Sequence, residues 1–232
     1  MRSLLLTLIL VATLGASAQQ NVKLKRRDYK RDVELTTTEG RIVLRLSDST
    51  PYHRDNFLRL VKSGYYDSVL FHRVIKGFMI QSGDPNSRRV AAGQGLGNGG
   101  PGYLIPAELR ATLFHRKGVL AAAREGDGPN PLRYSSASQF YIVQGRTFTD
   151  AEMDSIEVAR LQGRKIPPDR RAIYKSTGGT PQLDGNYTVF GEVLEGLDVV
   201  DRIATTPTST APRDRPVTDM RILKARLVKR KV

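Results

Sequence analysis

The chain has 232 residues, of which 39% are hydrophobic and 26% are charged, and its formal net charge is +14. This length suits one well-buried domain, and the composition is that of an ordinary globular protein. The absence of cysteine excludes disulfides, thiolate metal sites, cysteine catalysis and a lipidated cysteine behind a leader. The three histidines, His53, His72 and His115, do not have the spacing of metal ligands.

The N-terminus has the pattern of a secretory leader. Arg2 provides a positive charge, residues 4–14 form an apolar run, and residues 16–18 read Ala-Ser-Ala, a small-x-small cleavage pattern. The apolar run is well short of the roughly 20 residues that a membrane-spanning helix needs, so a membrane anchor is the weaker interpretation. We therefore expect a signal peptide over residues 1–18 and a mature protein that is periplasmic or secreted.

Most of the positive charge lies near the two ends of the mature chain. Residues 19–32, a basic linker, hold six basic and two acidic residues, and residues 221–232 hold six basic and no acidic residues. Terminal basic segments are typical of solvated tails or of loose attraction to anionic surfaces. The body lacks a basic helix interleaved with stacking aromatics. The pattern predicts no specific nucleic-acid partner, and weak association with an anionic envelope surface.

A hairpin and a short helix are predicted directly after the linker. Residues 33–46 alternate apolar and polar on either side of Glu39-Gly40, which indicates two strands joined by a turn. Thr50 and Pro51 have the chemistry of an N-cap and a first helical residue, and the helix would run to about Lys62. Its apolar face would hold Phe57, Leu60 and Val61.

Several strand-sized apolar runs follow, divided by glycines and prolines. They cover residues 69–75, 78–81, 119–123, 139–143 and 187–193. A second amphipathic helix would bring together Leu197, Val200 and Ile203, and a closing strand would place Leu223, Ala225 and Leu227 on one face. Many short strands with few helices predict a mainly β protein, closed or sandwiched, whose last strand pairs with an early one.

Residues 147–180 interrupt this pattern. Thr149 and Glu152 have the spacing of a capping box before a helix to about Gln162, which Gly163 would end. A basic stretch with a proline pair and a glycine pair follows. We interpret the segment as a helical insertion in a surface loop of a single domain over residues 33–232, because it is too short to have its own core.

Two local patterns are interpreted as structural features and not as functional sites. Residues 95–100 read GLGNGG and match the dinucleotide fingerprint literally, but no buried strand precedes them and Pro101-Gly102 follows. They are interpreted as a glycine-rich surface loop. His72 and Arg73 are neighbours in a predicted strand, so alternation places them on opposite faces, and His72 is interpreted as a structural residue.

The most informative stretch is residues 71–85, FHRVIKGFMIQSGDP. It places Arg73 a few residues before the apolar pair Phe78-Met79 and the amide Gln81. Residues 138–143, SQFYIV, again combine an amide with an apolar run, and no nucleophile, metal cluster or acid pair accompanies either motif. A fixed cation, an apolar wall and neutral amides suit a reaction in which no covalent bond is made or broken.

With GLGNGGPGYLIPAE, GVLAAA and LDGNYTVFGEV in the same order, these motifs resemble the cyclophilin family of peptidyl-prolyl cis-trans isomerases. The resemblance covers about Val33 to Val228, apart from the insertion. It implies a closed eight-stranded antiparallel β-barrel capped by two helices, acting on proline-containing polypeptides. We expect a monomer that needs no cofactor and no metal.

By similarity, the catalytic residue is Arg73. The substrate-binding residues implied by the resemblance comprise the wall of a proline pocket (Phe78, Met79, Tyr141, Leu183), two amides for the peptide backbone (Gln81, Gln139), Ala123 on the N-terminal side of the proline, and His72 at the margin.

Four substrate-site positions, Tyr141 among them, depart from the usual family pattern. Tyr141 stands where Phe is typical, Arg124 where Asn is common, and Tyr187 in place of a pocket His. Gln182 stands where eukaryotic members have a Trp important for cyclosporin binding, which implies weak inhibition by that drug. The main hypothesis is an isomerase that assists protein folding outside the cytoplasm. The alternative is a low-turnover proline-peptide binding module or holdase chaperone.

Overall fold

The computed structural model describes residues 22–90, 94–210 and 214–231; the expected signal peptide lies outside these residues. Nine strands form one antiparallel sheet in the order β3-β13-β1-β2-β10-β7-β9-β5-β4. Their bounds are β1 Arg31–Thr37, β2 Gly40–Leu46, β3 Val69–Leu70, β4 Arg73–Ile75, β5 Met79–Ser82, β7 Val119–Ala122, β9 Phe140–Val143, β10 Val189–Glu195 and β13 Arg221–Lys229. The mainly β prediction is confirmed.

Two small strand pairs and seven helical segments complete the described chain. The pairs are β6 (Leu104–Ile105) with β8 (Ser135–Ser136) and β11 (Thr208–Ser209) with β12 (Arg215–Pro216). The helices are α2 Pro51–Lys62, α3 Asp150–Ala159, α4 Pro168–Ser176 and α5 Leu197–Ala204, with short 3-10 turns η1 Asp28–Lys30, η2 Pro85–Arg89 and η3 Pro181–Leu183. Within the described ranges, no helix combines the length and apolar character needed to cross a membrane.

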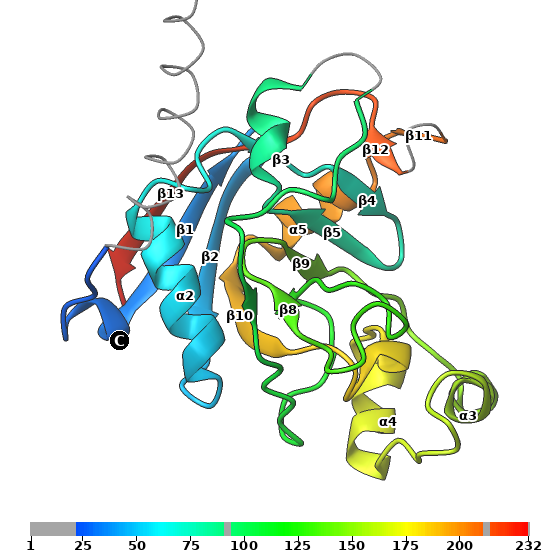
Figure 1. Ribbon diagram of the computed structural model, residues 1–232. Helices are drawn as coiled ribbons and strands as arrows, with labels where there is room; N and C mark the ends of the chain where they lie inside the picture. The colour runs from blue at the N-terminus through cyan, green and yellow to red at the C-terminus, as the bar shows by residue number, and fades with distance from the viewer. Residues whose placement is uncertain (1–21, 91–93, 211–213, 232) are drawn as a thin grey trace, which may run out of the picture.

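The ends of the sheet are two pieces of one predicted strand. Over residues 69–75, β3 pairs with β13, whereas β4 pairs with β5 at the far end of the order. The sheet therefore curls until both of its ends meet the same short stretch of chain (Figure 1). Among the described residues no ladder joins β3 to β4, so the eight-stranded, fully closed barrel stays a prediction. The expected pairing of the last strand with an early one is confirmed, because β13 pairs with β1 along its length.

Helix α2 begins as predicted but is capped from a distance. Pro51 is its first residue, yet the hydroxyl of Thr50 makes no capping bond. Instead the carboxylate of Glu108 accepts hydrogen bonds from the backbone N–H groups of Tyr52 and His53, at 3.2 and 2.9 Å. A carboxylate at this end of the helix also interacts favourably with the positive end of the helix dipole. The apolar face of α2 enters the main core as expected, through Phe57, Leu60 and Val61.

The closing strand differs from simple alternation. The register between β1 and β13 shifts where Thr36 pairs with Lys224 and Thr37 with Ile222. Leu223 is the extra residue of this bulge, and it is 50% exposed, while Ile222 and Ala225 are buried. The predicted face of Leu223, Ala225 and Leu227 is therefore wrong at Leu223, because a bulge moves one residue out of the period of two.

Residues 147–180 form a compact lobe that contains α3 and α4, away from α2 (Figure 1). The capping box of Thr149 and Glu152 is present. The lobe also has a small core of its own, which corrects the expectation that it is too short for one. Met153 and Tyr174 are completely buried in it, and the other buried members are Phe148, Leu161 and Ile166, with Phe114 packed against them.

Candidate active site

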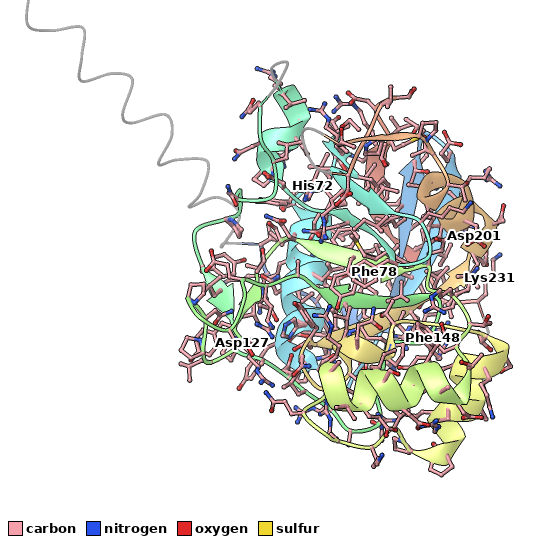
Figure 2. All side chains as sticks on the ribbon, turned by 90° about the vertical axis from the view of Figure 1, so that its right-hand side faces the viewer. His72, Phe78, Asp127, Phe148, Asp201 and Lys231 are labelled. Atoms are coloured by element: carbon pink, nitrogen blue, oxygen red, sulfur yellow. The ribbon has the colours of Figure 1, made fainter. Side chains whose placement is uncertain are left out.

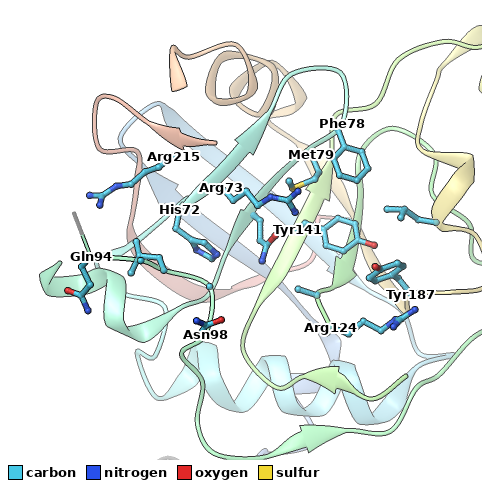
Figure 3. A pocket seen from close by; sticks show the side chains of 16 residues that line it. His72, Arg73, Phe78, Met79, Gln94, Asn98, Arg124, Tyr141, Tyr187 and Arg215 are labelled. Carbon is cyan, nitrogen blue, oxygen red and sulfur yellow. The ribbon is translucent and has the colours of Figure 1, made fainter. Parts of the chain in front are cut away.

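Ten of the twelve residues predicted for the site line one open pocket of about 440 Å³. Figure 3 shows Arg73, Phe78, Met79, Tyr141 and Tyr187 around it. The two predicted residues that do not line this pocket are Gln139 and Gln182. Their different positions are described below.

The sheet register places the central site residues in a row. Arg73 on β4 lies opposite Gln81 on β5, and Gln81 lies opposite Tyr141 on β9. Directly opposite residues of antiparallel strands project from the same face of a sheet. The cation, the amide and the aromatic ring are therefore brought to one surface by backbone pairing. Met79, two residues from Gln81, joins them because side chains alternate with a period of two.

Both His72 and Arg73 line the pocket, which corrects the expectation that they point to opposite faces. The alternation argument assumed one continuous strand. In the structure β3 ends at Leu70 and β4 begins at Arg73, so His72 lies in the break between them. The chain changes its partner strand there, and the period of two does not carry across the break.

The guanidinium of Arg73 has an acidic neighbour, Asp214, which directly precedes β12. Its Nε lies 3.5 Å from a carboxylate oxygen of Asp214, and the backbone N–H of Val74 donates to the Asp214 carbonyl at 2.8 Å. Asp214 itself adopts the left-handed conformation, with a φ of 57°. The side chain of Arg73 keeps 39% of its surface exposed, so it is oriented by Asp214 and remains open to a substrate.

His72 is buried and uncharged at neutral pH. Burial is the main cause that lowers its pKa to about 4, and the nearby cations Arg73 and Arg215 act in the same direction. The Asp84 carboxylate and the Leu70 carbonyl act in the opposite direction, each more strongly than the two arginines, but less than burial. Neither ring nitrogen has a hydrogen bond of good geometry to the described part of the chain. A neutral imidazole next to Arg73 adds no competing positive charge to the pocket.

The glycine-rich segment is a surface loop, as predicted, and it also forms a wall of the pocket. Residues 94–98 line the cavity. The buried carboxylate of Asp84 holds this loop by accepting from the backbone N–H groups of Gly97 and Gly99, at 2.6 and 3.3 Å. No helix follows the loop, in agreement with the rejection of a dinucleotide fingerprint.

Gln139 links this wall to the floor of the pocket. Its Nε2 donates to the carbonyl oxygens of Gly97 and Gly99 at 2.7 and 2.9 Å, and its Oε1 accepts from the Gln81 amide at 3.1 Å. These contacts orient Gln81 and the loop, and the contact of Gln139 with a peptide backbone stays a prediction.

Tyr141 carries a hydroxyl that ends a buried chain of hydrogen bonds. The hydroxyl lies 3.0 Å from His115 Nε2, and His115 Nδ1 lies 3.0 Å from Asp184 Oδ1. Tyr174 of α4 donates to the other oxygen of Asp184 at 2.8 Å. Burial raises the pKa of Tyr141 well above its ordinary value, so its hydroxyl stays protonated. The chain connects the pocket to the core of the insertion.

The other positions that differ from the usual family pattern lie where the pocket meets the insertion. Arg124 stacks over the ring of Tyr187 at 4.5 Å, pairs with Asp127 at 2.7 Å and donates to the Asn186 carbonyl at 2.8 Å. Gln182 lines a neighbouring second pocket instead of the first. Six pocket residues were missed by the sequence prediction: Gln94, Gly95, Leu96, Gly97 and Asn98 of the glycine-rich loop, and Arg215. The G-x-G-x-x-G match marked their loop, but nothing in the sequence indicated Arg215.

The described residues contain no group of three or more His, Cys, Asp or Glu side chains that could hold a metal ion. The pocket therefore offers a guanidinium, amides and apolar walls. Such a set can bind a peptide and stabilise a change in its charge distribution.

Comparison with known proteins agrees with this chemistry. A family model described as cyclophilin type peptidyl-prolyl cis-trans isomerase/CLD matches residues 32–227. A Staphylococcus saprophyticus protein, provisionally named a peptidyl-prolyl cis-trans isomerase, is 34% identical over 205 residues, which cover 88% of this chain and 94% of that protein. A Staphylococcus haemolyticus protein with the same provisional name is 34% identical over 203 residues, covering 87% and 92%.

The fold has solved relatives as well. The crystal structure of a Cryptosporidium parvum cyclophilin type peptidyl-prolyl cis-trans isomerase superposes with a TM-score of 0.63 at 25% identity, covering 87% of this chain and 99% of that one. A second structure of that protein, in the presence of the dipeptide Ala-Pro, gives a TM-score of 0.62 at 24% identity, with 86% and 99% covered. The chain belongs to the cyclophilin-type peptidyl-prolyl cis-trans isomerases.

Proposed function

We propose that this isomerase catalyses rotation about X-Pro bonds of polypeptide clients, and that Arg73 donates a hydrogen bond to the imide nitrogen in the twisted transition state. The row of Arg73, Gln81 and Tyr141 on one face of three paired strands carries the proposal. The solved relative studied in the presence of Ala-Pro supports a proline-containing ligand. We assign the apolar pocket to the proline ring and the guanidinium to the reacting nitrogen.

The barrier explains why an arginine suits this task. Rotation about an X-Pro bond loses amide resonance and faces a barrier of about 18–20 kcal/mol. At the twisted transition state the imide nitrogen regains a lone pair that the planar amide lacks. A hydrogen bond to that lone pair is available chiefly in the transition state, which is the condition for acceleration. Arginine stays charged and has a rigid fork, whereas lysine offers neither the planar geometry nor weak hydration.

The size of the effect is within reach of this arrangement. A 10⁴-fold acceleration requires about 5.5 kcal/mol. One charge-assisted hydrogen bond, together with a peptide held in the reactive orientation, can supply this. Asp214 would contribute by holding Arg73 in place without covering it.

We further propose that the protein works in the periplasm or after secretion, where it assists the folding of exported proteins. The leader-like pattern of residues 1–18 supports this location. Uncatalysed prolyl exchange takes tens to hundreds of seconds and can limit folding, so a catalyst is useful to such clients. The division of the chain into leader, basic linker and one isomerase domain over residues 33–232 is part of the same proposal.

Attraction of the basic ends to an anionic envelope surface would have to come mainly from the N-terminal side. Near the C-terminus most basic side chains already have acidic partners, as in Lys224–Asp67 at 2.6 Å, Arg226–Glu34 at 2.7 Å and Lys231–Glu195 at 2.8 Å. These pairs offset the positive field of that end. Salt-dependent co-sedimentation with anionic vesicles, with and without residues 19–27, would test the proposal.

The decisive experiment measures cis-trans exchange of a short Ala-Pro peptide by NMR, with wild type and Arg73→Ala. We expect Arg73→Ala to lower the exchange rate at least tenfold while the fold, followed by circular dichroism, is unchanged. Arg73→Lys should recover only part of the loss. Arg59→Ala, at an exposed arginine of α2, is the matched control and should turn over as wild type does.

The same measurement separates the enzyme from a binding module or holdase. If wild type and Arg73→Ala bind the peptide alike and exchange it at the same slow rate, the catalytic role of Arg73 is refuted and a low-turnover binder is the better description.

A further inference from the structure

A second pocket of about 630 Å³ adjoins the proline pocket. The two pockets share Phe78, Arg124, Leu183 and Tyr187 in their walls. A peptide that places its proline in the first pocket therefore passes these shared residues on its way into the second. The inference below rests on the proposed function, because it concerns the residues that flank the bound proline.

The far wall of the second pocket comes from the insertion. Phe148 precedes α3, and Ile156 and Arg160 belong to α3 and its C-terminal end. Figure 2 shows Phe148 beside α3 and Phe78 above it, with Asp127 on the same face. The capping box and the small core of the insertion fix this wall. The second pocket is thus a product of the segment that interrupts the family pattern.

The arginines of this pocket differ in whether they have an acidic partner. Arg124 is paired with Asp127, and Arg146 stacks on Phe148 at 4.0 Å and pairs with Glu152 at 2.8 Å. Arg160 is exposed, and its guanidinium has no acidic partner within 4 Å among the residues that the structure describes. The pocket therefore presents one uncompensated positive charge at the end of α3.

Gln182 contributes a polar atom to the wall of the second pocket. Its amide oxygen is buried in the wall, with no hydrogen-bond donor in the described ranges. A buried acceptor without a partner is unfavourable, because it has lost its hydrogen bonds to water. A small rotation of this amide would offer the oxygen to an N–H group of a peptide lying in the pocket.

We propose that the second pocket binds a glutamate that flanks the proline of the client, and that the insertion thereby sets substrate preference. The aliphatic part of the glutamate packs against Phe148 and Ile156, as long charged side chains do on apolar surfaces. Its carboxylate pairs with Arg160, and Gln182 accepts from the peptide backbone. Arg160 is the specificity-determining residue of this site.

The test compares peptides that differ by one isosteric change. The series consists of short peptides with a central Ala-Pro. In each pair of peptides, one position within three residues of the proline carries either Glu or Gln, and the other positions are unchanged. For every pair, the exchange rate constant and the dissociation constant are measured by NMR at low and high salt. At one position, wild type should favour Glu over Gln by about fivefold at low salt, and high salt should reduce this ratio, because surface ion pairs are screened.

Arg160→Gln and Arg59→Gln change the net charge equally and together locate the effect. Arg160→Gln should bring the Glu-to-Gln ratio close to one, whereas Arg59→Gln, on α2 and outside both pockets, should keep the wild-type ratio. A third variant, Arg160→Glu, should invert the ratio. Equal loss in Arg160→Gln and Arg59→Gln would show a general field effect and overturn the site.

A ratio near one at every position in wild type would also overturn it. A failure of the proposed isomerase function would give a different result. Exchange of the Gln peptides would then be no faster with wild type than without protein. The dissociation constants still decide the Glu preference in that case, so the second pocket is tested independently of turnover.

Discussion

The floor and the rim of the proline pocket are held in place by different forces. The floor consists of Met79, Gln81 and Tyr141 on β5 and β9, and backbone ladders on both sides fix it. The rim is the glycine-rich wall around residues 94–98, which has no ladder of its own. It is held by the backbone N–H groups of Gly97 and Gly99, which donate to Asp84, and by Gln139, which donates to the carbonyl oxygens of the same two glycines.

This difference shows where single substitutions can act selectively. A ladder shares its hydrogen bonds among many residues, so one side-chain change in the floor leaves the backbone in place. The rim relies on one buried carboxylate and one amide, and the loss of either releases several backbone groups together. Changes to the rim should therefore have larger effects than changes to single side chains of the floor.

The largest effect is expected at Asp84. Its carboxylate is fully buried and accepts from the backbone N–H groups of Asn86, Gly97 and Gly99. Asp84→Ala leaves these donors unsatisfied, and hydrogen bonds to a charged group are each worth about 1.5–3 kcal/mol. We expect the free energy of unfolding in urea to fall by about 3 kcal/mol or more, and the affinity for an Ala-Pro peptide to fall with it.

Asp84→Asn is the informative partner of this variant, because it keeps the size of the side chain but has one acceptor oxygen. It should lie between wild type and Asp84→Ala in both measurements. If Asp84→Ala unfolds at the wild-type urea concentration, the rim does not depend on this carboxylate and the contrast with the floor is lost.

The floor could be predicted from the sequence, and the reasons are local. The apolar runs around Met79 and Tyr141 are strand-sized, and the spacing of Arg73, Met79 and Gln81 resembles the family motif. Residues two apart on a strand share a face, so the prediction needed no knowledge of partner strands. The register between β4, β5 and β9 then brought the motifs together.

The rest depended on pairings that a single sequence does not reveal. His72 was misplaced because the chain changes its partner strand at Phe71-His72. Leu223 was misplaced because a bulge shifts the register of β13. The cap that Glu108 gives to α2 joins residues more than 50 positions apart. In each case a contact between distant segments overrides the local pattern.

His72 lies between the floor and the rim. Its pKa should report whether water reaches the boundary between them. Its folded-state pKa of about 4 is below the 6.5 of a free histidine. Between these values the unfolded chain binds a proton that the folded chain does not, so stability is lost as the pH falls from about 6.5 to 4. The shift corresponds to about 3 kcal/mol at the acid end. Urea unfolding of wild type and His72→Gln at several pH values measures it.

The comparison between the two proteins is essential, because burial also lowers the pKa of His53 and both proteins share that contribution. The difference between their unfolding free energies should change steadily from pH 6.5 to 4 and level off outside this window. A difference that stays constant across the window would mean that water reaches His72 and that the boundary is open.

The smallest effect is expected where the floor is tied to the insertion. Tyr141→Phe and Tyr174→Phe each remove one hydroxyl from the chain through His115 and Asp184, and each should lower the unfolding free energy by about 1 kcal/mol. Since both hydroxyls belong to one buried network, the double variant should lose less than the sum of the two.

The double-mutant cycle in urea also tests the link between pocket and insertion. Tyr141→Phe keeps the aromatic ring in the pocket, so its KM for an Ala-Pro peptide should change by less than about threefold, and any change in kcat should be smaller. If the two single effects add completely, the hydroxyls act independently. The insertion would then contribute only the wall of the second pocket, without steadying the ring on which the proline is proposed to lie.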